Sequence, residues 1–585
     1  MRKIYWKHII SSFLVFGGAV LAAFPQTQTV STPERPNVIL IITDDQGYGD
    51  MSCHGNPLLE TPEIDKLHSQ SIRFTNFHVD PTCAPTRAGL LTGRYSSRVG
   101  VWHTLQGRSI MNKDEITLAQ VFTENDYHTA LIGKWHLGDN YPYRPQDRGY
   151  QEVISFGGGG IGQNPDYWRN DYFSDIFSHN GIPEFFEGYC TDTWFNEAIK
   201  YIDQQKDSSA PFFCQIATNA PHFWYYVPEK YAQPFREEGM EDHLARYLGM
   251  MVNLDENIGK LMTKLEEWAI AENTLLIFMT DNGKSSYKLP KKGPHYYNAG
   301  MRGVKGSQYE GGHRVPLFIK WPEGGLSGGK DIQTLSAQID IMPTLIELCG
   351  LENKYTIKFD GKSLVPLLKS ENPGWEERTL FVHNQRVETP VKWKTSVVMN
   401  DRYRLINGKE LYDILEDPGQ KKDIGSSHPE IVKVLTGEYE LWWQDISESF
   451  DEYSRLLIGD EHENPIKLTC HDWHNEKPLT VWNQDIIRDR KHENGFWTVE
   501  VVQDGEYQFT CRTYPLEEDT RMNVTKVLLK IGGKEVEKDC YAGASEVSFT
   551  LTLKKGETEI ESWFYEEDGN SFGVPFLYVE RLVTP

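Results

Sequence analysis

Short apolar runs alternate with amphipathic segments over the first 370 or so residues. Four of the runs are NVILIIT (37–43), HTALIG (128–133), FFCQIA (212–217) and NTLLIFMT (273–280). Between them, segments such as RYLGMMVNLDENIGKLMTKLEEWA (246–269) repeat apolar side chains at helical spacing. Apolar runs separated by helices are typical of parallel strands with crossover connections. This part therefore predicts an α/β domain, with helices on both faces of a large mixed, mostly parallel sheet.

The pattern changes twice further along the chain. Residues 375–455 contain YRLINGKELYDILEDP (403–418), which predicts a hairpin, and PEIVKVLTGEYELWWQDI (429–446), which predicts a helix. From 461 to 585, apolar and polar residues alternate around Asp-Gly and Lys-Gly turns. We expect a domain at 36–370, a small α+β subdomain at 375–455 and a β-sandwich-like accessory domain at 461–585.

The first 24 residues differ from the rest. A basic start precedes an apolar run over residues 9–24 that contains the small residues Ala22 and Ala23 near its end. This order is typical of a signal peptide, and the run is short for a spanning helix, which needs about 20 apolar residues. We expect residues 1–24 to be cleaved and the mature chain to be periplasmic or secreted, without stable membrane insertion.

Charge and cysteine content exclude several classes of protein. The formal charge of −24 argues against a nucleic-acid partner, because phosphates need a basic surface. A polyanionic ligand would need a local basic cluster to overcome this field. The eight cysteines show no Cys-x-x-Cys spacing, so neither a disulfide scaffold nor a structural zinc site is predicted, although one or two disulfides remain open.

Polar side chains follow four of the predicted strands at the point where each strand ends. They are Asp44 and Asp45, Lys134 and His136, His222, and Asp281 and Asn282. Any one of these groups alone is ordinary turn or cap chemistry. However, ligands of parallel sheets bind beyond the carboxyl ends of the strands, so all four groups should meet at one edge. Their carboxylate and amide oxygens suit Ca²⁺ or Mg²⁺ rather than zinc.

The stretch CAPTRAGLLTGR (83–94) carries a candidate nucleophile. Pro85 suits the first turn of a helix, which places Cys83 where backbone N–H groups favour an anion. Arg87 lies one turn further on. A helix N-terminus, cationic side chains and a metal ion around one nucleophile suit a tetrahedral oxyanion ester. A thiolate nucleophile, a disulfide and a metal ligand remain alternative roles for Cys83, but hard-cation ligands have no obvious use in thiol chemistry.

Several motifs resemble those of one enzyme family. Residues 83–87 followed by LLTGR match the sulfatase signature C-x-P-x-R. DYHTALIGKWHLG (126–138) resembles the second sulfatase signature, with Asp126 where the family usually has glycine. ITDDQGYGD, ATNAPH, FMTDNG, MRGVKGSQYEGGHRVP and LYDILEDP continue the likeness. Residues 36–455 thus resemble the formylglycine-dependent type I sulfatases, which have an alkaline-phosphatase-like fold.

The resemblance implies a sulfuric ester hydrolase in which a maturation enzyme oxidises Cys83 to formylglycine. The implied Ca²⁺ ligands, with Mg²⁺ as an alternative ion, are Asp44, Asp45, Asp281, Asn282 and the modified Cys83. A hydroxyl of the hydrated aldehyde attacks sulfur, and the remaining hydroxyl then expels sulfate. The resemblance implies that Arg87 and Asp281 activate the nucleophile, and that Lys134 and Lys305 bind the sulfate oxygens. It also implies that His222, with Lys305, protonates the leaving oxygen. His136 would then deprotonate the remaining hydroxyl.

The expected substrate is a sulfated carbohydrate, with galactose or N-acetylhexosamine sulfates favoured. The loop over residues 288–306 carries five cations and is the candidate basic patch. Candidate substrate-binding residues are His103, His295 and Arg302. The last part of the chain contains four notable tryptophans, Trp473, Trp482, Trp497 and Trp563. They belong either to a module that binds carbohydrate or covers the active site, or to the core of a small sandwich. Packing in a core is favoured.

Three alternative functions remain. They are hydrolysis of small aryl sulfates, a phosphatase or phosphonate monoester hydrolase of the same superfamily, and glycan binding without catalysis.

Overall fold

The computed structural model describes residues 1, 35–371 and 373–582. Apart from Met1, the predicted signal peptide lies outside the described residues. From Arg35 onwards the chain forms one compact unit. Within the described part of the chain, no helix combines the length and the apolarity that a bilayer crossing requires.

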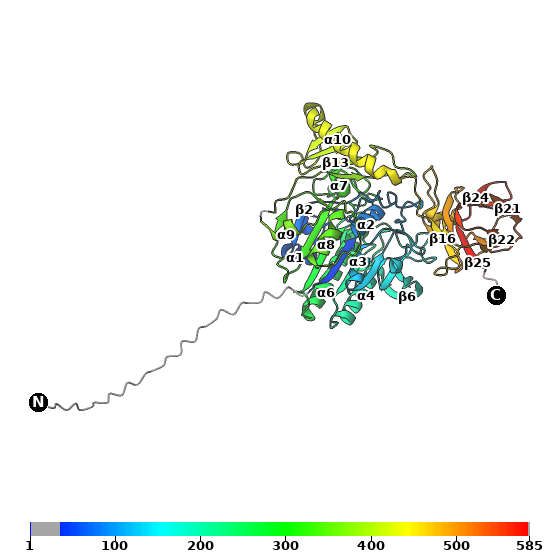
Figure 1. Cartoon of the computed structure of the whole chain (residues 1–585), viewed down its shortest axis with the longest axis horizontal. Helices are drawn as coiled ribbons and strands as arrows, with labels where there is room; N and C mark the ends of the chain where they lie inside the picture. Colours follow the sequence, from blue (N-terminus) through cyan, green and yellow to red (C-terminus); the bar gives the residue numbers. More distant parts are fainter. Residues whose placement is uncertain (2–34, 372, 583–585) are drawn as a thin grey trace. The chain divides into compact units, whose positions relative to one another are not determined.

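An 11-stranded sheet lies at the centre of the first part of the chain (Figure 1). Its order is β10-β2-β9-β8-β1-β7-β3-β4-β5-β6, and β11 pairs with β2. The strands are β1 (Asn37–Thr43), β2 (Ile72–His78), β3 (His128–Lys134), β4 (Glu152–Phe156), β5 (Phe173–His179), β6 (Ile182–Tyr189), β7 (Phe212–Ala217), β8 (Thr274–Thr280), β9 (Arg314–Lys320), β10 (Asp331–Ile332) and β11 (Ser336–Ala337). The block β8-β1-β7-β3-β4 is parallel, whereas β9, β5 and β6 pair antiparallel with their neighbours. The predicted mixed, mostly parallel sheet is confirmed.

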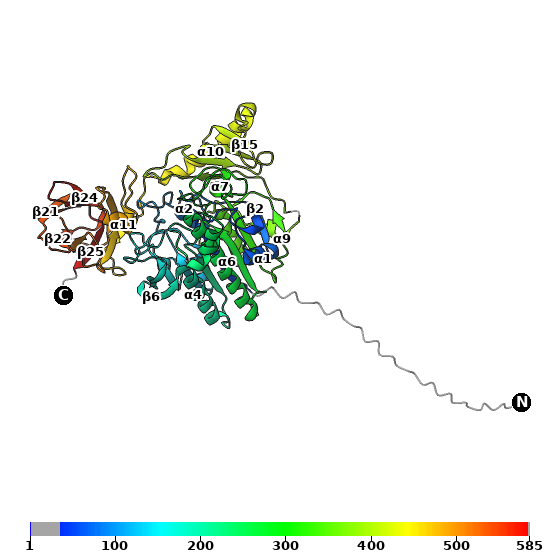
Figure 2. The same cartoon turned by 180° about the vertical axis from the view of Figure 1, so that it is seen from behind.

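Helices cover both faces of this sheet, as the views in Figure 1 and Figure 2 show. Successive side chains of a strand point to opposite faces, so Ile39 and Ile41 of β1 join one apolar cluster while Val38 and Leu40 join another. The first cluster contains α1 (Pro62–Gln70), α4 (Cys190–Gln205), α5 (Glu229–Glu237) and α6 (Asp242–Glu267); the second contains α2 (Cys83–Thr92), α3 (Leu118–Glu124), α8 (Ile341–Leu348) and α9 (Val365–Lys369). Because both faces are buried, the strands read as continuous apolar runs.

A four-stranded antiparallel sheet follows, in the order β12-β13-β14-β15. Its elements are β12 (Leu380–His383), β13 (Ser396–Met399), β14 (Tyr403–Ile406), β15 (Glu410–Asp413) and α10 (Pro429–Ile446). The predicted hairpin and helix are both confirmed. A buried ion pair of 2.8 Å joins Arg404 Nε of β14 to Glu310 Oε1 of α7 (Glu310–His313), which precedes β9 of the large sheet.

The β-rich end (residues 456–582) contains two sheets that share one apolar core. One has the order β16-β18-β23-β20-β21, with β24 beside β23, and the other has the order β17-β25-β19-β22. The elements are β16 (Leu456–Ile458), β17 (Ile466–Thr469), α11 (Gln484–Arg488), β18 (Phe496–Val501), β19 (Gly505–Arg512), β20 (Lys526–Ile531), β21 (Lys534–Asp539), β22 (Val547–Leu553), β23 (Gly556–Tyr565), β24 (Ser571–Gly573) and β25 (Phe576–Leu582). The predicted sandwich is present, and Trp473 and Trp497 pack in its core with ring centroids 5.7 Å apart.

Of the three Asp-Gly and Lys-Gly turns that the sequence predicts in this region, Asp568-Gly569 joins the antiparallel pair β23 and β24, and the other two do not close hairpins. Asp504-Gly505 leads from β18 to β19, and Lys555-Gly556 leads from β22 to β23. In each case the two strands belong to different sheets. A sandwich needs such crossings, because its chain must pass between the two layers. All eight cysteines are free thiols, so neither of the disulfides left open by the sequence forms.

Candidate active site

The four strand ends singled out in the sequence meet at one edge of the large sheet. β1 lies between β8 and β7, with Thr43 opposite Thr280 and Ile42 opposite Ala217. β3 is the next strand, with Gly133 opposite Ala217. The polar residues that follow these strands are therefore neighbours. We call this the catalytic edge: the carboxyl ends of β1, β3, β7 and β8.

Three carboxylates of the catalytic edge are almost completely buried: Asp44 and Asp281 are 0% exposed and Asp45 is 2% exposed. Candidate ligand atoms of Asp44, Cys83 and Asp281 lie within 4.8 Å of one another. Asn282 Nδ2 donates to Asp45 Oδ1 at 2.9 Å. Among the described residues, Asn282 Oδ1 and Asp44 Oδ1 have no hydrogen-bond partner. Burial, followed by the charge of Asp281, raises the pKa of Asp44 well above its ordinary value.

This donor set fits a hard cation. Unpartnered buried oxygens are costly, and a divalent ion would both coordinate them and offset the repulsion between the carboxylates. Apart from the sulfur of Cys83, the donor atoms are oxygens, as Ca²⁺ and Mg²⁺ prefer. The residues predicted as metal ligands thus lie together with suitable chemistry.

Cys83 lies at the start of α2, as predicted. Thr82 precedes the helix in an extended conformation, and Gly93 ends it with a left-handed φ of 67°. All ten residues of α2 are buried, so the position of Cys83 is set by packing. Cys83 Sγ is 3.9 Å from Lys305 Nζ. The candidate nucleophile therefore lies between a helix N-terminus and a cationic side chain, where negative charge is stabilised.

Each cation of the catalytic edge is paired with one carboxylate. Arg87 Nη2 contacts Asp281 Oδ2 at 2.8 Å, Lys134 Nζ contacts Asp44 Oδ2 at 2.6 Å, and Lys305 Nζ contacts Asp45 Oδ1 at 2.5 Å. Burial by itself would raise the pKa of Asp45, but Lys305 and His222 outweigh it and lower that pKa. Arg87 also donates to the backbone carbonyl of Lys134 at 3.1 Å, which ties α2 to the end of β3.

Both predicted histidines lie at this edge, His136 buried and His222 partly exposed. His136 Nε2 donates to the carbonyl of Thr104 at 2.9 Å, so Nδ1 is the nitrogen left to accept a proton, and it has no partner. His222 Nε2 is 3.8 Å from Asp45 Oδ2. Burial is the main cause that lowers the pKa of His222 to about 3 and that of His136 well below its ordinary value. In the free protein both imidazoles are therefore neutral.

Gly159 lets the chain approach His136 closely. A Cβ atom at this glycine would lie 2.3 Å from His136 Cε1. A larger residue here would push the imidazole out of place.

A cavity of about 410 Å³ opens above this edge. Cys83, His136, His222 and Lys305 line it. Arg87, Lys134 and the carboxylates do not line it and are fully or almost fully buried. The residues that the sequence places at one edge therefore form two sets in the structure. One set lines the cavity, and the other is buried and does not line it.

Sequence reasoning did not single out Gln163, Arg386, Leu479 or Thr480 of the cavity wall, and it favoured core packing over substrate contact for Trp482. None of them belongs to a motif, and they come from loops far apart in the chain. Only Trp482 carried a signal, as one of four tryptophans in the last part of the sequence.

Of the three candidate substrate residues, His103 lines the cavity. Its Nδ1 accepts hydrogen bonds from the backbone N–H groups of Thr104 and Leu105 at 2.8 and 2.9 Å. Burial lowers the pKa of His103 to about 3, so the ring is neutral and Nε2 carries the proton. His103 can therefore donate a hydrogen bond to an oxygen in the cavity.

The other two candidates lie elsewhere. The Arg302 guanidinium lies 3.6 Å from the centroid of the Tyr309 ring and donates to the Tyr412 hydroxyl at 3.1 Å. His295 is half-buried on the same loop. Neither lines the cavity, because the loop that carries them packs Arg302 against β15 instead.

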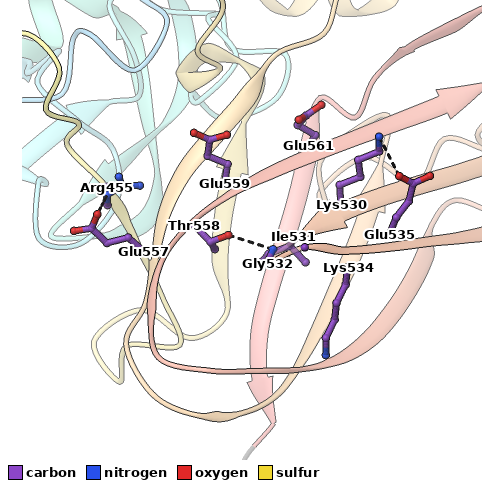
Figure 3. Close-up of a pocket in the computed structure, with 11 residues that line it drawn as sticks. Arg455, Lys530, Ile531, Gly532, Lys534, Glu535, Glu557, Thr558, Glu559 and Glu561 are labelled. Carbon is purple, nitrogen blue, oxygen red and sulfur yellow. Dashed lines mark hydrogen bonds and ion pairs between the residues drawn. The ribbon is translucent and has the colours of Figure 1, made fainter.

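A larger hollow of about 630 Å³ lies on the β-rich end (Figure 3). Its walls carry charged side chains that already pair with each other, such as Arg455 with Glu557 and Lys530 with Glu535. It offers no cluster of buried carboxylates and no nucleophile among its lining residues. Size alone therefore does not identify the active site.

Asp126 has a backbone φ of +60°, the left-handed region that favours glycine. Aspartate is among the few other residues that adopt it readily. The departure from the sulfatase signature therefore leaves the turn before β3 intact.

Comparisons with known proteins show which family the chain belongs to. Residues 36–351 match the sulfatase family, and residues 304–440 match the family described as N-sulphoglucosamine sulphohydrolase, C-terminal. Arylsulfatase G of Mus musculus is 31% identical over 371 residues, which cover 57% of this chain and 69% of the relative. N-acetylgalactosamine-6-sulfatase of Homo sapiens is 29% identical over 356 residues, which cover 57% and 66%.

A solved structure, Ps i-CgsB in complex with k-i-k-neocarrahexaose, superposes with a TM-score of 0.64 and 28% identity over 72% of this chain and 95% of that one. The sulfatase match alone extends over more than half of the sequence. The chain therefore belongs to the sulfatase family and is a sulfuric ester hydrolase.

Proposed function

We propose that this sulfatase is exported and removes sulfate from sulfated glycans, with galactose or N-acetylhexosamine sulfates as the preferred class. The observation that carries the proposal is the position of Cys83, beside Lys305 and the buried carboxylates at the floor of one cavity. Among its relatives are N-acetylgalactosamine-6-sulfatases, and a similar solved structure was determined with a neocarrahexaose. The wide cavity, lined by polar groups and one tryptophan, is compatible with a sugar.

The donor set supports a calcium site, with Mg²⁺ as the alternative. Asp44, Asp45, Asp281 and Asn282 would hold the ion. When present, the ion would polarise the sulfate ester, and formylglycine made from Cys83 would supply, as its hydrate, the attacking hydroxyl. A maturation enzyme would be the partner that makes this modification.

The two lysines differ in what they reach. Lys305 faces the cavity beside Cys83, so it is placed to bind a sulfate oxygen and stabilise charge that develops on it. Lys134 is 0% exposed and balances the charge of Asp44 in this structure. Arg87, paired with Asp281, holds that carboxylate beneath Cys83. Lys305 is therefore the lysine we expect to contact substrate directly.

The two histidines are the proposed proton donor and proton acceptor of the reaction. His222 lines the cavity, and we propose that it takes up a proton when the anionic substrate binds and then donates that proton to the departing alcohol oxygen. His136 also lines the cavity and has a free Nδ1 lone pair, which we propose accepts the proton released when sulfate leaves. Two separate histidines allow one group to act as acid and the other as base.

Peptide mass spectrometry tests the proposal directly. In protein from a host that contains the maturation enzyme, the peptide with position 83 should be about 18 Da lighter than the cysteine form, as conversion of –CH₂SH to –CHO requires. Cys83→Ala should abolish sulfate release while leaving the melting temperature unchanged. Substantial turnover by purified Cys83→Ala would overturn the proposal.

The substrate class is tested with matched esters. Galactose 6-sulfate, N-acetylgalactosamine 6-sulfate and 4-nitrophenyl sulfate should be compared with 4-nitrophenyl phosphate. We expect the sugar sulfates to have the highest kcat/KM. A preference for the aryl sulfate or for the phosphate would favour one of the two alternative hydrolases.

A further inference from the structure

The wall of the cavity above Cys83 comes from three distant parts of the chain. His103 and Gln163 belong to loops of the large-sheet domain, Arg386 follows β12, and Trp482 belongs to the β-rich end. Residues 475–483, which we call the strap, run along this wall. The β-rich end thus reaches the cavity that contains the candidate nucleophile.

The strap is held at both ends by side chains of the large-sheet domain. Gln106 Nε2 donates to the carbonyl of Asn475 at 2.9 Å, and Gln106 Oε1 accepts from Leu479 N at 3.4 Å. At the other end, Asn164 Nδ2 donates to the carbonyl of Val481 at 2.9 Å. Gln106 is 3% exposed and Asn164 is 0% exposed. Trp482, the next residue, is therefore held at a defined place on the wall.

The ring of Trp482 differs from the other tryptophans near it. Trp473 and Trp497 are at most 1% exposed and pack against each other in the sandwich core. Trp482 is only half-buried and lines the cavity. Among the described residues its ring has no aromatic or cationic partner. An indole face that is held in place but uncovered offers a flat apolar surface of the kind that packs on a sugar ring.

Arg386 is the second unusual group. It is exposed, and within the described part of the chain its guanidinium has no hydrogen bond or ion pair. Its nearest acidic neighbour in sequence, Glu388, is already occupied by Arg108 and His474, each at 3.0 Å. In a chain with a net charge of −24, an arginine without a carboxylate partner is available for an external anion.

We propose that Trp482 and Arg386 form one sugar subsite of the active site, in which Trp482 packs against the ring that carries the scissile sulfate and Arg386 binds a second anionic group on the adjoining ring. The second group is a carboxylate or a sulfate, both of which accept paired hydrogen bonds from a guanidinium. This inference rests on the proposed function. It makes the β-rich end a part of the active site, instead of a glycan-binding module that acts on its own.

The test compares ratios of kcat/KM, because a merely structural defect lowers all substrates together. The substrates are 4-nitrophenyl sulfate, N-acetylgalactosamine 6-sulfate, and disaccharides in which the neighbouring ring bears a uronic carboxylate, a second sulfate or no charge. Trp482→Ala should lower the ratio of every sugar to the aryl sulfate by about three- to tenfold. Trp482→Tyr should restore most of it.

Arg386→Ala should act only on the charged disaccharides. We expect their kcat/KM to fall by about tenfold or more relative to the uncharged disaccharide, mainly through KM. Comparison of the carboxylated and disulfated disaccharides shows which anion the arginine prefers. The matched controls are Trp563→Ala and Arg521→Ala on the β-rich end, which lie outside the cavity lining.

The outcomes separate the two proposals. If the wild-type protein lacks formylglycine and releases no sulfate, the proposed function fails. If the wild-type protein is active but neither Trp482→Ala nor Arg386→Ala changes any ratio, the subsite is wrong. Because Arg386 is exposed and tyrosine keeps an aromatic ring, Arg386→Ala and Trp482→Tyr should fold normally, which melting temperatures will check.

Discussion

The catalytic edge and the β-rich end differ in the kind of side chain that they bury. At the catalytic edge, Asp44, Asp281 and Lys134 are 0% exposed and Arg87 is 1% exposed. In the β-rich end the interior is apolar, as in the cluster around Trp497. The ion pairs on its surface are solvated, as in the Lys530–Glu535 pair, whose side chains are 42% and 61% exposed, although Asp472 and Arg512 of the same region are each only 4% exposed.

The difference shows which region is shaped by packing and which by chemistry. Burial of apolar surface stabilises a fold in proportion to the area removed from water. Burial of ion pairs gives little net stability, because desolvation offsets the attraction. The buried charges of the catalytic edge therefore serve substrate binding and catalysis more than stability. The surrounding sheet and helices hold these side chains in place.

The largest effect should come from breaking a buried pair at the catalytic edge. Asp281→Ala leaves the guanidinium of Arg87 buried without its carboxylate. We expect the free energy of unfolding to fall by about 3–5 kcal/mol, measured by chemical denaturation. Asp504→Ala, which removes an exposed partner of Lys554, is the control. If Asp281→Ala lowered the free energy of unfolding by less than about 1 kcal/mol, the Arg87–Asp281 pair would behave like a solvent-exposed ion pair.

Calcium should stabilise the catalytic edge. The ion would bind the folded protein through Asp44, Asp45, Asp281 and Asn282 but would not find this cluster in the unfolded chain. At a free concentration of 100 times Kd, the gain should be about 2.7 kcal/mol, seen as a rise in Tm after treatment with EGTA and readdition of Ca²⁺.

The control for the calcium response is Asp45→Asn, which should weaken it, and Mg²⁺ should be tested in parallel. A Tm that responds to neither ion would contradict the proposed site, whatever the activity of the protein.

A smaller effect is expected from the apolar core of the β-rich end. Ile560 of β23 is 0% exposed, and Ile560→Val removes one methylene from it. The expected cost is about 0.5–1.5 kcal/mol, measured by denaturation of the full chain. The Tm rise with Ca²⁺ should keep its wild-type size. If the calcium response changed with Ile560→Val, the two regions would not be separable in the way described above.

The smallest effect should come from the exposed pair of the β-rich end. Glu535→Ala removes the partner of Lys530, whose side chain remains solvated. The free energy of unfolding should change by no more than about 0.5 kcal/mol, and less at high salt. A change comparable to that of Asp281→Ala would remove the contrast between the regions.

Much of the fold was predictable because its signals are local. The runs 37–43 and 212–217 are strands with the predicted bounds, and the helix at 429–446 has both predicted ends. Their apolar periodicity reflects burial, which each stretch of sequence records by itself. The turn at Asp504-Gly505 was also predictable, but the sheet that each flanking strand joins was not. Strand pairing depends on partners that lie far away in the sequence.

The same distinction applies to the active site. Asp44, Asp281 and His222 were found because each follows a strand, and Lys134 because it ends one; parallel strands end at a common edge. Arg302 was expected near substrate from its place on a basic loop, but the structure packs it on Tyr309. A loop sequence gives no periodicity from which the direction of a side chain can be inferred.

The sequence by itself determined the sulfatase motifs, the strands that carry them and the set of residues at the catalytic edge, because helix starts and strand ends place side chains through local geometry. Only the tertiary structure decided which lysine faces the cavity, that Arg302 packs on Tyr309 instead, and that Arg386 and Trp482 line the same cavity as Cys83. Those outcomes depend on contacts between segments up to several hundred residues apart, and no short stretch of sequence contains them.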